Sequence, residues 1–389
     1  MTALDALNLT GQPELTAAVG AALVYLQQTQ LQQLSHLQLP VFRADQLSGM
    51  QIDASSRRNL ELHTTLGGSR RGSLIAVIDH TVTPMGARLL RGWLDQPMAD
   101  LAAIAARHDA VQCLVDSELL LDELRAMLAE IRDMERILAR IALGRAYPRD
   151  YRGMAESLLA LPRLVHEIKK QVGLFASIRT ALEGLDSLAV HLDAAVEPSP
   201  PALFRDGGVV RAGFDSELDR LREVASSASE WLSSYELKQR EQTGISTLKV
   251  KYNKVFGYFI EVSKAQSAAV PDHFVRKQTL VNCERYITDE LHSFESEILG
   301  AKDAVMQQEQ QLIAALQQRV CHDGTAIQSA AAAVATLDVL ASFAWVARTH
   351  GYCRPLMHDG SALHIVRGRH PVVEQMLSGD ATFVANDCT

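Results

Sequence analysis

The residues best suited to chemistry in this chain lie between Ile245 and Tyr286, where basic side chains and neutral donors gather. Residues 245–280 hold six lysines or arginines and two acids, a local charge of 6 − 2 = +4, whereas the whole chain carries −8. Cationic groups with amide and hydroxyl donors between them suit the repeating phosphates of a nucleic-acid backbone. The candidate contacts are Lys249, Lys251, Asn253, Lys254, Arg276, Lys277, Gln278, Thr279 and Asn282.

The same residues also fit a plainer interpretation, a solvated sheet face that binds nothing. A single surface lysine is explained as well by solvation as by a ligand, so the prediction depends on the residues taken together. Phe256, Tyr258, Phe259 and Tyr286 could stack on bases, but their alternation with polar residues favours a buried core. We therefore expect contact with the backbone of the nucleic acid and not with its bases.

Two other groups of ionisable residues could do acid–base chemistry. Asp79 and His80 lie near two threonines, but no nucleophile with an orienting third group accompanies them, which favours helix capping or turn bonding. The second group consists of Arg132, Asp133, Glu135, Arg136 and Arg140. It could be read as the carboxylate pair of a nuclease, yet its spacing favours salt bridges along one helix. The sequence thus predicts no catalytic residues.

The cysteines and histidines do not form a recognisable metal site. The five cysteines are widely spaced and include no C-x-x-C pair, so neither a disulfide framework nor a zinc site is indicated. Cys321 with His322, and His350 with Cys353, offer only two ligands each without partners at useful spacing. We expect no bound metal, and this cysteine usage fits a reducing cytoplasm.

The basic residues lie on a predicted β-hairpin flanked by long helices. Apolar and polar residues alternate over 248–253 and again over 256–262, with Asn253-Lys254 joining the two runs. One charged helix is expected over Phe214–Gln242, with Asp215 as its N-cap. A second is expected over Thr288–His322, roughly 50 Å long at 1.5 Å per residue. The two helices can pair antiparallel and carry the β insertion at their tip.

Helical patterns dominate the rest of the chain. They cover residues 14–37, almost all of 55–192, and a later stretch that ends near His350. Four prolines are each expected near a helix start or stop, namely Pro84, Pro97, Pro148 and Pro162. Strand-like residues return at Leu363. The predicted fold class is mainly α: a helical core, two long antiparallel helices, a small antiparallel β insertion, and a strand-like C-terminal edge.

Length and composition fit a soluble chain of two or three domains, with 389 residues of which 47% are hydrophobic and 22% charged. A pI near 5.9 argues against a protein coated all over by nucleic acid. It allows a local site, because charges act within a Debye length of about 8–10 Å. The amino terminus lacks the features of a signal peptide, and the apolar run Ala17–Leu26 is shorter than the ~20 residues of a membrane span. We expect no membrane partner.

Several blocks, in order over more than 300 residues, resemble the bacterial MutS DNA mismatch repair family. They are Arg58–Leu62, Gly72–Leu74, Asp79–Gly86, Asp133–Arg140, Gly213–Asp219, Leu248–Tyr258, Arg276–Thr288, and Gly368–Pro371 with Asn386-Asp387. Each block alone is weak, but their order and spacing make the resemblance specific. Lys251 departs from the family pattern, since many members have glycine at this place.

The resemblance implies a domain order. It comprises the tail of a connector domain over 1–40, a helical core and first lever over 41–235, a β-rich DNA clamp over 236–287, a second lever and return to the core over 288–352, and the start of an ATPase domain over 353–389. No G-x-x-x-x-G-K-[ST] phosphate loop occurs. The resemblance also leaves out the family's amino-terminal mismatch-reading domain, which carries a Phe-x-Glu wedge. We therefore expect a fragment without the mismatch-recognition and ATPase domains that does not hydrolyse ATP.

The resemblance also implies partners. These are double-stranded DNA, a second copy of the chain and a MutL-type protein in the full-length family, with ATP and Mg²⁺ as cofactors only there. Two alternatives remain open from the residues: a helical protein–protein docking scaffold without DNA binding, and a hydrolase or nuclease. A duplex titration at two salt concentrations tests the first, and turnover assays with ATP or DNA plus magnesium test the second.

Overall fold

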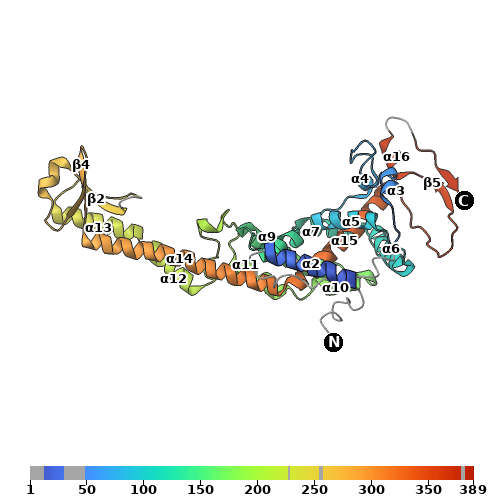
Figure 1. Cartoon of the computed structure of the whole chain (residues 1–389), viewed down its shortest axis with the longest axis horizontal. Helices are drawn as coiled ribbons and strands as arrows, with labels where there is room; N and C mark the ends of the chain where they lie inside the picture. Colours follow the sequence, from blue (N-terminus) through green and yellow to red (C-terminus); the bar gives the residue numbers. More distant parts are fainter. Residues whose placement is uncertain (1–12, 30–48, 227, 254–256, 378–381) are drawn as a thin grey trace. The chain divides into compact units, whose positions relative to one another are not determined.

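The computed structural model describes residues 13–29, 49–226, 228–253, 257–377 and 382–389. The chain divides into two compact units, Met1–Asp193 with Gln317–Thr389, and Ala194–Leu316, and each unit is described by itself. Helices account for most of the described residues, and the strands form two small antiparallel sheets (Figure 1). The predicted mainly α fold class is thus confirmed.

The first unit is built mostly from short and medium-length helices. They are α2 (Pro13–Thr29), α3 (Ala54–Asn59), α4 (Leu74–Ile78), α5 (Pro84–Asp95), α6 (Leu101–Asp116), α7 (Glu118–Glu130), α8 (Met134–Ala142), α9 (Pro148–Glu167), α10 (Leu174–Leu182), α15 (Gly324–His350) and α16 (Pro371–Met376). Two more, α11 (Asp186–Ala195) and α14 (Asp289–His322), contain residues of both units. Strands β5 (Ile365–Gly368) and β6 (Asn386–Cys388) pair antiparallel.

Helix α15 forms the centre of the first unit and packs against α5, α6, α7, α8 and α10. Its alanine-rich sequence lets these helices approach closely, and Ala331, Val334 and Leu337 are fully buried. By length and composition α15 could cross a membrane, but 72% of its most apolar stretch is buried inside the protein, as in the core helix of a globular domain. It ends at Gly351, whose left-handed backbone (φ 64°, ψ 41°) terminates the helix.

A buried carboxylate joins α15 to the start of α5. Asp338 accepts hydrogen bonds from the backbone N–H of Val82 (2.9 Å) and of Thr83 (2.8 Å), and from the Thr83 hydroxyl (2.6 Å). These donors precede the first turn of α5, where backbone N–H groups lack helical partners. The contact requires a glycine at position 86, since a Cβ there would lie 2.2 Å from Asp338 Oδ2.

The prolines mark helix boundaries with one exception. Pro84 and Pro148 begin α5 and α9, where a missing N–H costs nothing, and Pro97 follows α5. The expectation was wrong for Pro162, which lies inside α9. Both sides of it are well packed, with Leu158, Leu161 and Leu164 buried, so tertiary contacts hold the helix through the proline.

The strand-like C-terminal edge forms a ribbon within the first unit. The register of β5 and β6 pairs Ile365 with Cys388 and Gly368 with Asn386. Arg369 ties the ribbon to the end of α15, donating to the carbonyls of His350 (2.9 Å) and Gly351 (3.0 Å). The segment thus pairs with itself.

The second unit contains antiparallel helices and a small sheet. Its elements are η2 (Phe204–Asp206), α12 (Ser216–Ser226), α13 (Ala228–Thr243), β1 (Lys249–Asn253), β2 (Gly257–Ser263), η3 (Lys264–Ala269), β3 (Val275–Thr279), β4 (Cys283–Ile287) and most of α14. Asp215 caps α12 as predicted, accepting from the N–H of Leu218 at 2.8 Å. Position 227, between α12 and α13, lies outside the described residues, as do 1–12 and 30–48, where most of the expected connector tail falls.

Contacts between α14 and the two preceding helices run in opposite sequence order, which establishes the antiparallel arrangement. Near one end Asp215 accepts from Gln308 Nε2 (3.1 Å). Near the other end Trp231 stacks on Phe294 (ring centroids 3.4 Å apart), and Tyr235 hydrogen-bonds with Thr288. The predicted pairing of the two helical segments is confirmed within this unit.

Candidate nucleic-acid interface

The four-stranded sheet lies beside α13 and α14 (Figure 1), and side chains of both helices accept hydrogen bonds from its backbone. Glu236 of α13 accepts from the N–H of Val250 (2.8 Å), and Glu295 of α14 accepts from the N–H of Tyr258 (3.1 Å). Gly257 makes the second contact possible: its φ is +72°, and a Cβ there would lie 1.8 Å from Glu295 Oε1. The sheet is therefore held as a rigid platform on the helices.

The order of the sheet is β1-β2-β4-β3, all antiparallel, and the register separates two faces. Directly paired residues point to the same side of a sheet. The core face carries Val250, Ile260, Val262 and Tyr286, which pack with Tyr235, Ile245, Leu248 and Leu291. The opposite face, here called the outer face, carries Lys249, Lys251, Asn253, Phe259, Glu261, Gln278 and Arg285.

The structure brings only some of the predicted contact residues together. Lys249, Lys251, Asn253 and Gln278 share the outer face. An irregularity in the β3–β4 register between Arg276 and Gln278 leaves Lys277 between the two faces. Arg276 pairs with Tyr286 and Thr279 pairs with Glu284, so both lie on the side of the core face. Asn282 is exposed in the β3–β4 turn. Lys254 lies outside the described residues. The described members of the predicted set therefore divide between the two faces, the irregularity at Lys277 and the β3–β4 turn.

Carboxylates already partner two of the predicted cations. Lys251 Nζ lies 2.7 Å from Glu261 Oε1, and Arg276 Nη1 lies 3.6 Å from Glu284 Oε1. Among the residues that the structure describes, no carboxylate is within ion-pair distance of Lys249 or Lys277, and both lysines are exposed. These two are thus the best placed to meet an external anion.

Arg285 is a residue of the outer face that sequence reasoning missed. Its guanidinium lies over the Phe259 ring (Cζ 4.3 Å from the centroid) and donates to Gln278 Oε1 at 2.8 Å. The available signal was the alternation of Cys283, Arg285 and Ile287 with the buried Glu284 and Tyr286, which assigns Arg285 to the same face as the lysines.

Among the aromatic residues predicted to be core, Phe259 and Tyr286 are buried and Tyr258 is partly buried, whereas Phe256 lies outside the described residues. Tyr252 of β1, for which no prediction was made, is 54% exposed. Phe259 and Tyr286 are only 3% and 6% exposed. Burial, together with a hydrogen bond to Glu284, raises the pKa of Tyr286 to about 12. Neither ring offers a face for base stacking, which leaves the charged and amide groups of the outer face to contact a ligand.

The acidic cluster around Asp133 is structural, but its partners differ from those expected. The predicted pairing within one helix is present between Asp133 and Arg136 at 3.6 Å. The shorter bonds cross to other helices: both Asp133 oxygens accept from Arg88 (2.7 and 2.8 Å), and Arg140 pairs with Asp150 at 2.6 Å. Helical spacing alone could not reveal these partners, which are brought near by α5 and α9.

The remaining ionisable groups also have structural partners. Asp79 accepts from the hydroxyl of Thr81 (2.6 Å) and Thr83 caps α5 through the N–H of Gly86, so the turn-and-cap interpretation is confirmed. Within the described part of the chain, no three His, Cys, Asp or Glu side chains group closely enough to hold a metal ion.

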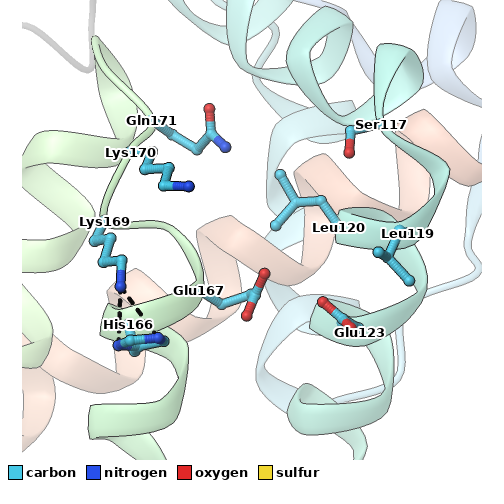
Figure 2. A pocket seen from close by; sticks show the side chains of 9 residues that line it. All are labelled: Ser117, Leu119, Leu120, Glu123, His166, Glu167, Lys169, Lys170 and Gln171. Atoms are coloured by element: carbon cyan, nitrogen blue, oxygen red, sulfur yellow. Dashed lines mark hydrogen bonds between the residues drawn. The ribbon is translucent and has the colours of Figure 1, made fainter.

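A cavity of about 280 Å³ in the first unit lies between α7 and the end of α9. Figure 2 shows the side chains of Glu123 and Glu167 pointing toward each other across it. The pKa of Glu123 is raised, mainly by burial and to a smaller extent by repulsion from Glu167. Ser117 lies far from His166, whose ring nitrogens face Lys169 Nζ at 3.2 and 3.4 Å. The cavity does not align a nucleophile with a base.

Comparison with known proteins agrees with this architecture. The family described as MutS domain III matches residues 55–344. The chain is similar to "DNA mismatch repair protein MutS" of Symbiobacterium thermophilum (42% identical over 377 residues, 96% of this chain and 42% of that protein), of Anaeromyxobacter dehalogenans (43% over 390 residues, 99% and 44%) and of Chlorobaculum parvum (43% over 373 residues, 95% and 42%). It spans less than half the length of these curated relatives. The chain therefore belongs to the MutS family of DNA mismatch repair proteins.

Proposed function

We propose that this region acts in DNA mismatch repair by holding duplex DNA through non-specific contacts of the outer face, together with the neighbouring Lys277, with the phosphate backbone. The observation that carries the proposal is the group of exposed cations, Lys249 and Lys277 above all, near an outer face whose aromatic residue, Phe259, is buried. Such a surface offers charge and hydrogen-bond donors but no base-stacking groups, and so suits backbone contact without sequence reading.

In the full-length protein, helices α12 to α14 would act as levers between this clamp and an ATPase domain. The hydrogen-bond ladder of a helix resists compression, so displacement at one end reaches the other. Packed elements switch between discrete arrangements, which would let nucleotide state open or close the clamp. ATP and Mg²⁺, a second copy of the chain, a MutL-type partner and a cytoplasmic location belong to this proposal for the whole protein. For the present chain we propose no ATP hydrolysis.

Duplex titration by fluorescence anisotropy at 50 and 200 mM salt tests the DNA contact. If the outer face neutralises about three phosphates, affinity falls roughly 40-fold between the two conditions, from a slope of about −0.9 per phosphate. The charge-reversed variant Lys249→Glu/Lys277→Glu should lose most of this binding. Because no described carboxylate pairs with either lysine, the substitutions break no ion pair.

The matched control is Lys169→Glu/Lys170→Glu, which makes the same charge change at two exposed lysines of the first unit. It should bind duplex like the wild type. Equal losses of duplex affinity in both variants would mean that the change in net charge, and not the position of the lysines, weakens binding. Wild-type protein without duplex affinity at 50 mM salt would refute the proposal and favour the alternative, a helical docking scaffold whose basic tip only aids solubility.

A further inference from the structure

The centre of the outer face is occupied by an acid. The register places Lys249, Glu261, Arg285 and Gln278 directly opposite one another across the four strands, so that Glu261 lies in the middle of a basic row. Lys251, one pair further along β1, reaches back to the same carboxylate at 2.7 Å. A surface used only to attract phosphates would gain from a neutral residue at this position, because the acid repels them.

Glu261 engages two of the cations of this face. Lys251 Nζ contacts its Oε1, and Arg285 Nε lies 3.6 Å from its Oε2. The hydrogen bond from Lys251, with the nearby charge of Arg285, lowers the pKa of Glu261, so the carboxylate is ionised at neutral pH. Its side chain is only 20% exposed, which reduces screening by solvent compared with a fully exposed pair. Lys251 and Arg285 are thus held against the sheet and partly neutralised.

We propose that Glu261 is a built-in counter-charge that limits the affinity of the outer face for DNA, because each phosphate must compete with it for Lys251 and Arg285. The inference rests on the proposed function and adds to it a residue that sets how tightly the backbone is held. A clamp whose cations exchange between an internal carboxylate and successive phosphates holds the duplex without arresting on any one phosphate. Arg285 thereby joins the contact surface as a cation released from Glu261.

The test is Glu261→Gln, which keeps the shape of the side chain and removes its charge. Freeing one cation for a phosphate should tighten duplex binding roughly eightfold at 0.1 M salt, and should steepen the salt dependence by about 0.9. Glu290→Gln is the matched control: it removes the same charge from an acid of α14 that pairs with Lys238 of α13 at 2.8 Å and is not part of the outer face. The control should bind within twofold of the wild type.

A second substitution separates a released cation from a change in net charge. On the Glu261→Gln background, Lys251→Gln should return affinity and salt slope to near wild-type values. Glu261→Ala should change binding in the same direction as Glu261→Gln, and it repeats the test if the melting curve of the glutamine variant departs from that of the wild type.

The outcomes separate the two proposals. If the wild type binds duplex DNA and Glu261→Gln binds it equally well or more weakly, the counter-charge proposal is wrong, and Glu261 would only position Lys251 and Arg285. The proposed function would not be affected by that result. An equal gain in Glu290→Gln also overturns it. If the wild-type protein shows no affinity for duplex DNA at low salt, the proposed function is refuted, and the inference that rests on it is refuted as well.

Discussion

Glu309 of α14 provides the sharpest test of how the second unit is held together. The carboxylate is 2% exposed and accepts from the backbone N–H groups of Gly208 (2.9 Å), Val209 (2.7 Å) and Val210 (2.9 Å), and from Arg222 Nη2 (3.0 Å). It fastens the segment before α12 to the long helix. Replacing it with glutamine keeps the side-chain volume, so that the change isolates charge and hydrogen bonding.

The expected cost follows from the four donors. With its oxygen in the place of Oε1, glutamine still accepts three hydrogen bonds, each weakened by about 1 kcal/mol because the charge is gone. The amide nitrogen then faces the N–H of Gly208, leaving a donor without an acceptor at a cost of about 1–3 kcal/mol. The sum, roughly 4–6 kcal/mol, is close to the penalty of about 3–5 kcal/mol for breaking a buried charged pair.

Hydrogen exchange measured by mass spectrometry on the peptide containing residues 208–210 is the direct assay. A loss of roughly 4 kcal/mol, the lower end of this range, should speed exchange of these amides by about a thousandfold. Glu223→Gln, an exposed acid of α12, is the control and should leave exchange unchanged. Equal exchange rates in wild-type protein and Glu309→Gln would refute the view that this carboxylate holds the segment.

Three further substitutions test the first unit. Gly86→Ala should destabilise it by about 1–3 kcal/mol in chemical denaturation, because the Cβ would meet Asp338 Oδ2 at 2.2 Å; Gly92→Ala on the same helix, with nothing within 4 Å of its Cβ, should instead be neutral or stabilising by up to ~1 kcal/mol. Burial raises the pKa of Asp150, but hydrogen bonds from Arg140 and a backbone amide outweigh it, so the pKa lies below its ordinary value. Because this pKa is lower in the folded state than in the unfolded state, ionised Asp150 stabilises the fold. Its contribution is complete above about pH 4 and is lost as pH falls through the lowered folded pKa. Asp150→Asn should therefore flatten the acid limb of the curve of unfolding free energy against pH. Burial raises the pKa of Asp338, so the folded state gains stability when this group takes up a proton at acid pH. Asp338→Asn removes that gain and should steepen the acid limb. A parallel shift of the curves of both variants would contradict these assignments.

The sequence predicted the parts of the fold that depend on local rules. The N-cap at Asp215, the long helix α14 and the alternation of buried and exposed residues in β1 and β2 all follow from periodicity and capping chemistry. The central role of α15 was not predicted, because an all-round apolar helix has no amphipathic period, and only its packing partners reveal its position.

The candidate site was predicted in composition but not in geometry. Clustering identified the basic residues, yet a single irregularity of register near Lys277 decides which face each residue of β3 occupies. The pairing of Lys251 with Glu261 and the position of Arg285 depend on strand order, since they join residues of β1, β2 and β4. Composition could not supply that order.

The order β1-β2-β4-β3 has a consequence for how the protein is handled in solution. The outermost strands of this sheet, β1 and β3, each have one side that no other described strand covers, and such edges can recruit strands from neighbouring molecules unless charges deter them. Lys249 and Lys251 on one edge, and Lys277 on the other, supply those charges. Alanine at these positions would therefore both favour aggregation through the strand edges and weaken any attraction to DNA. Glutamate keeps the edges charged, so loss of binding in a charge-reversed variant is not confounded by aggregation.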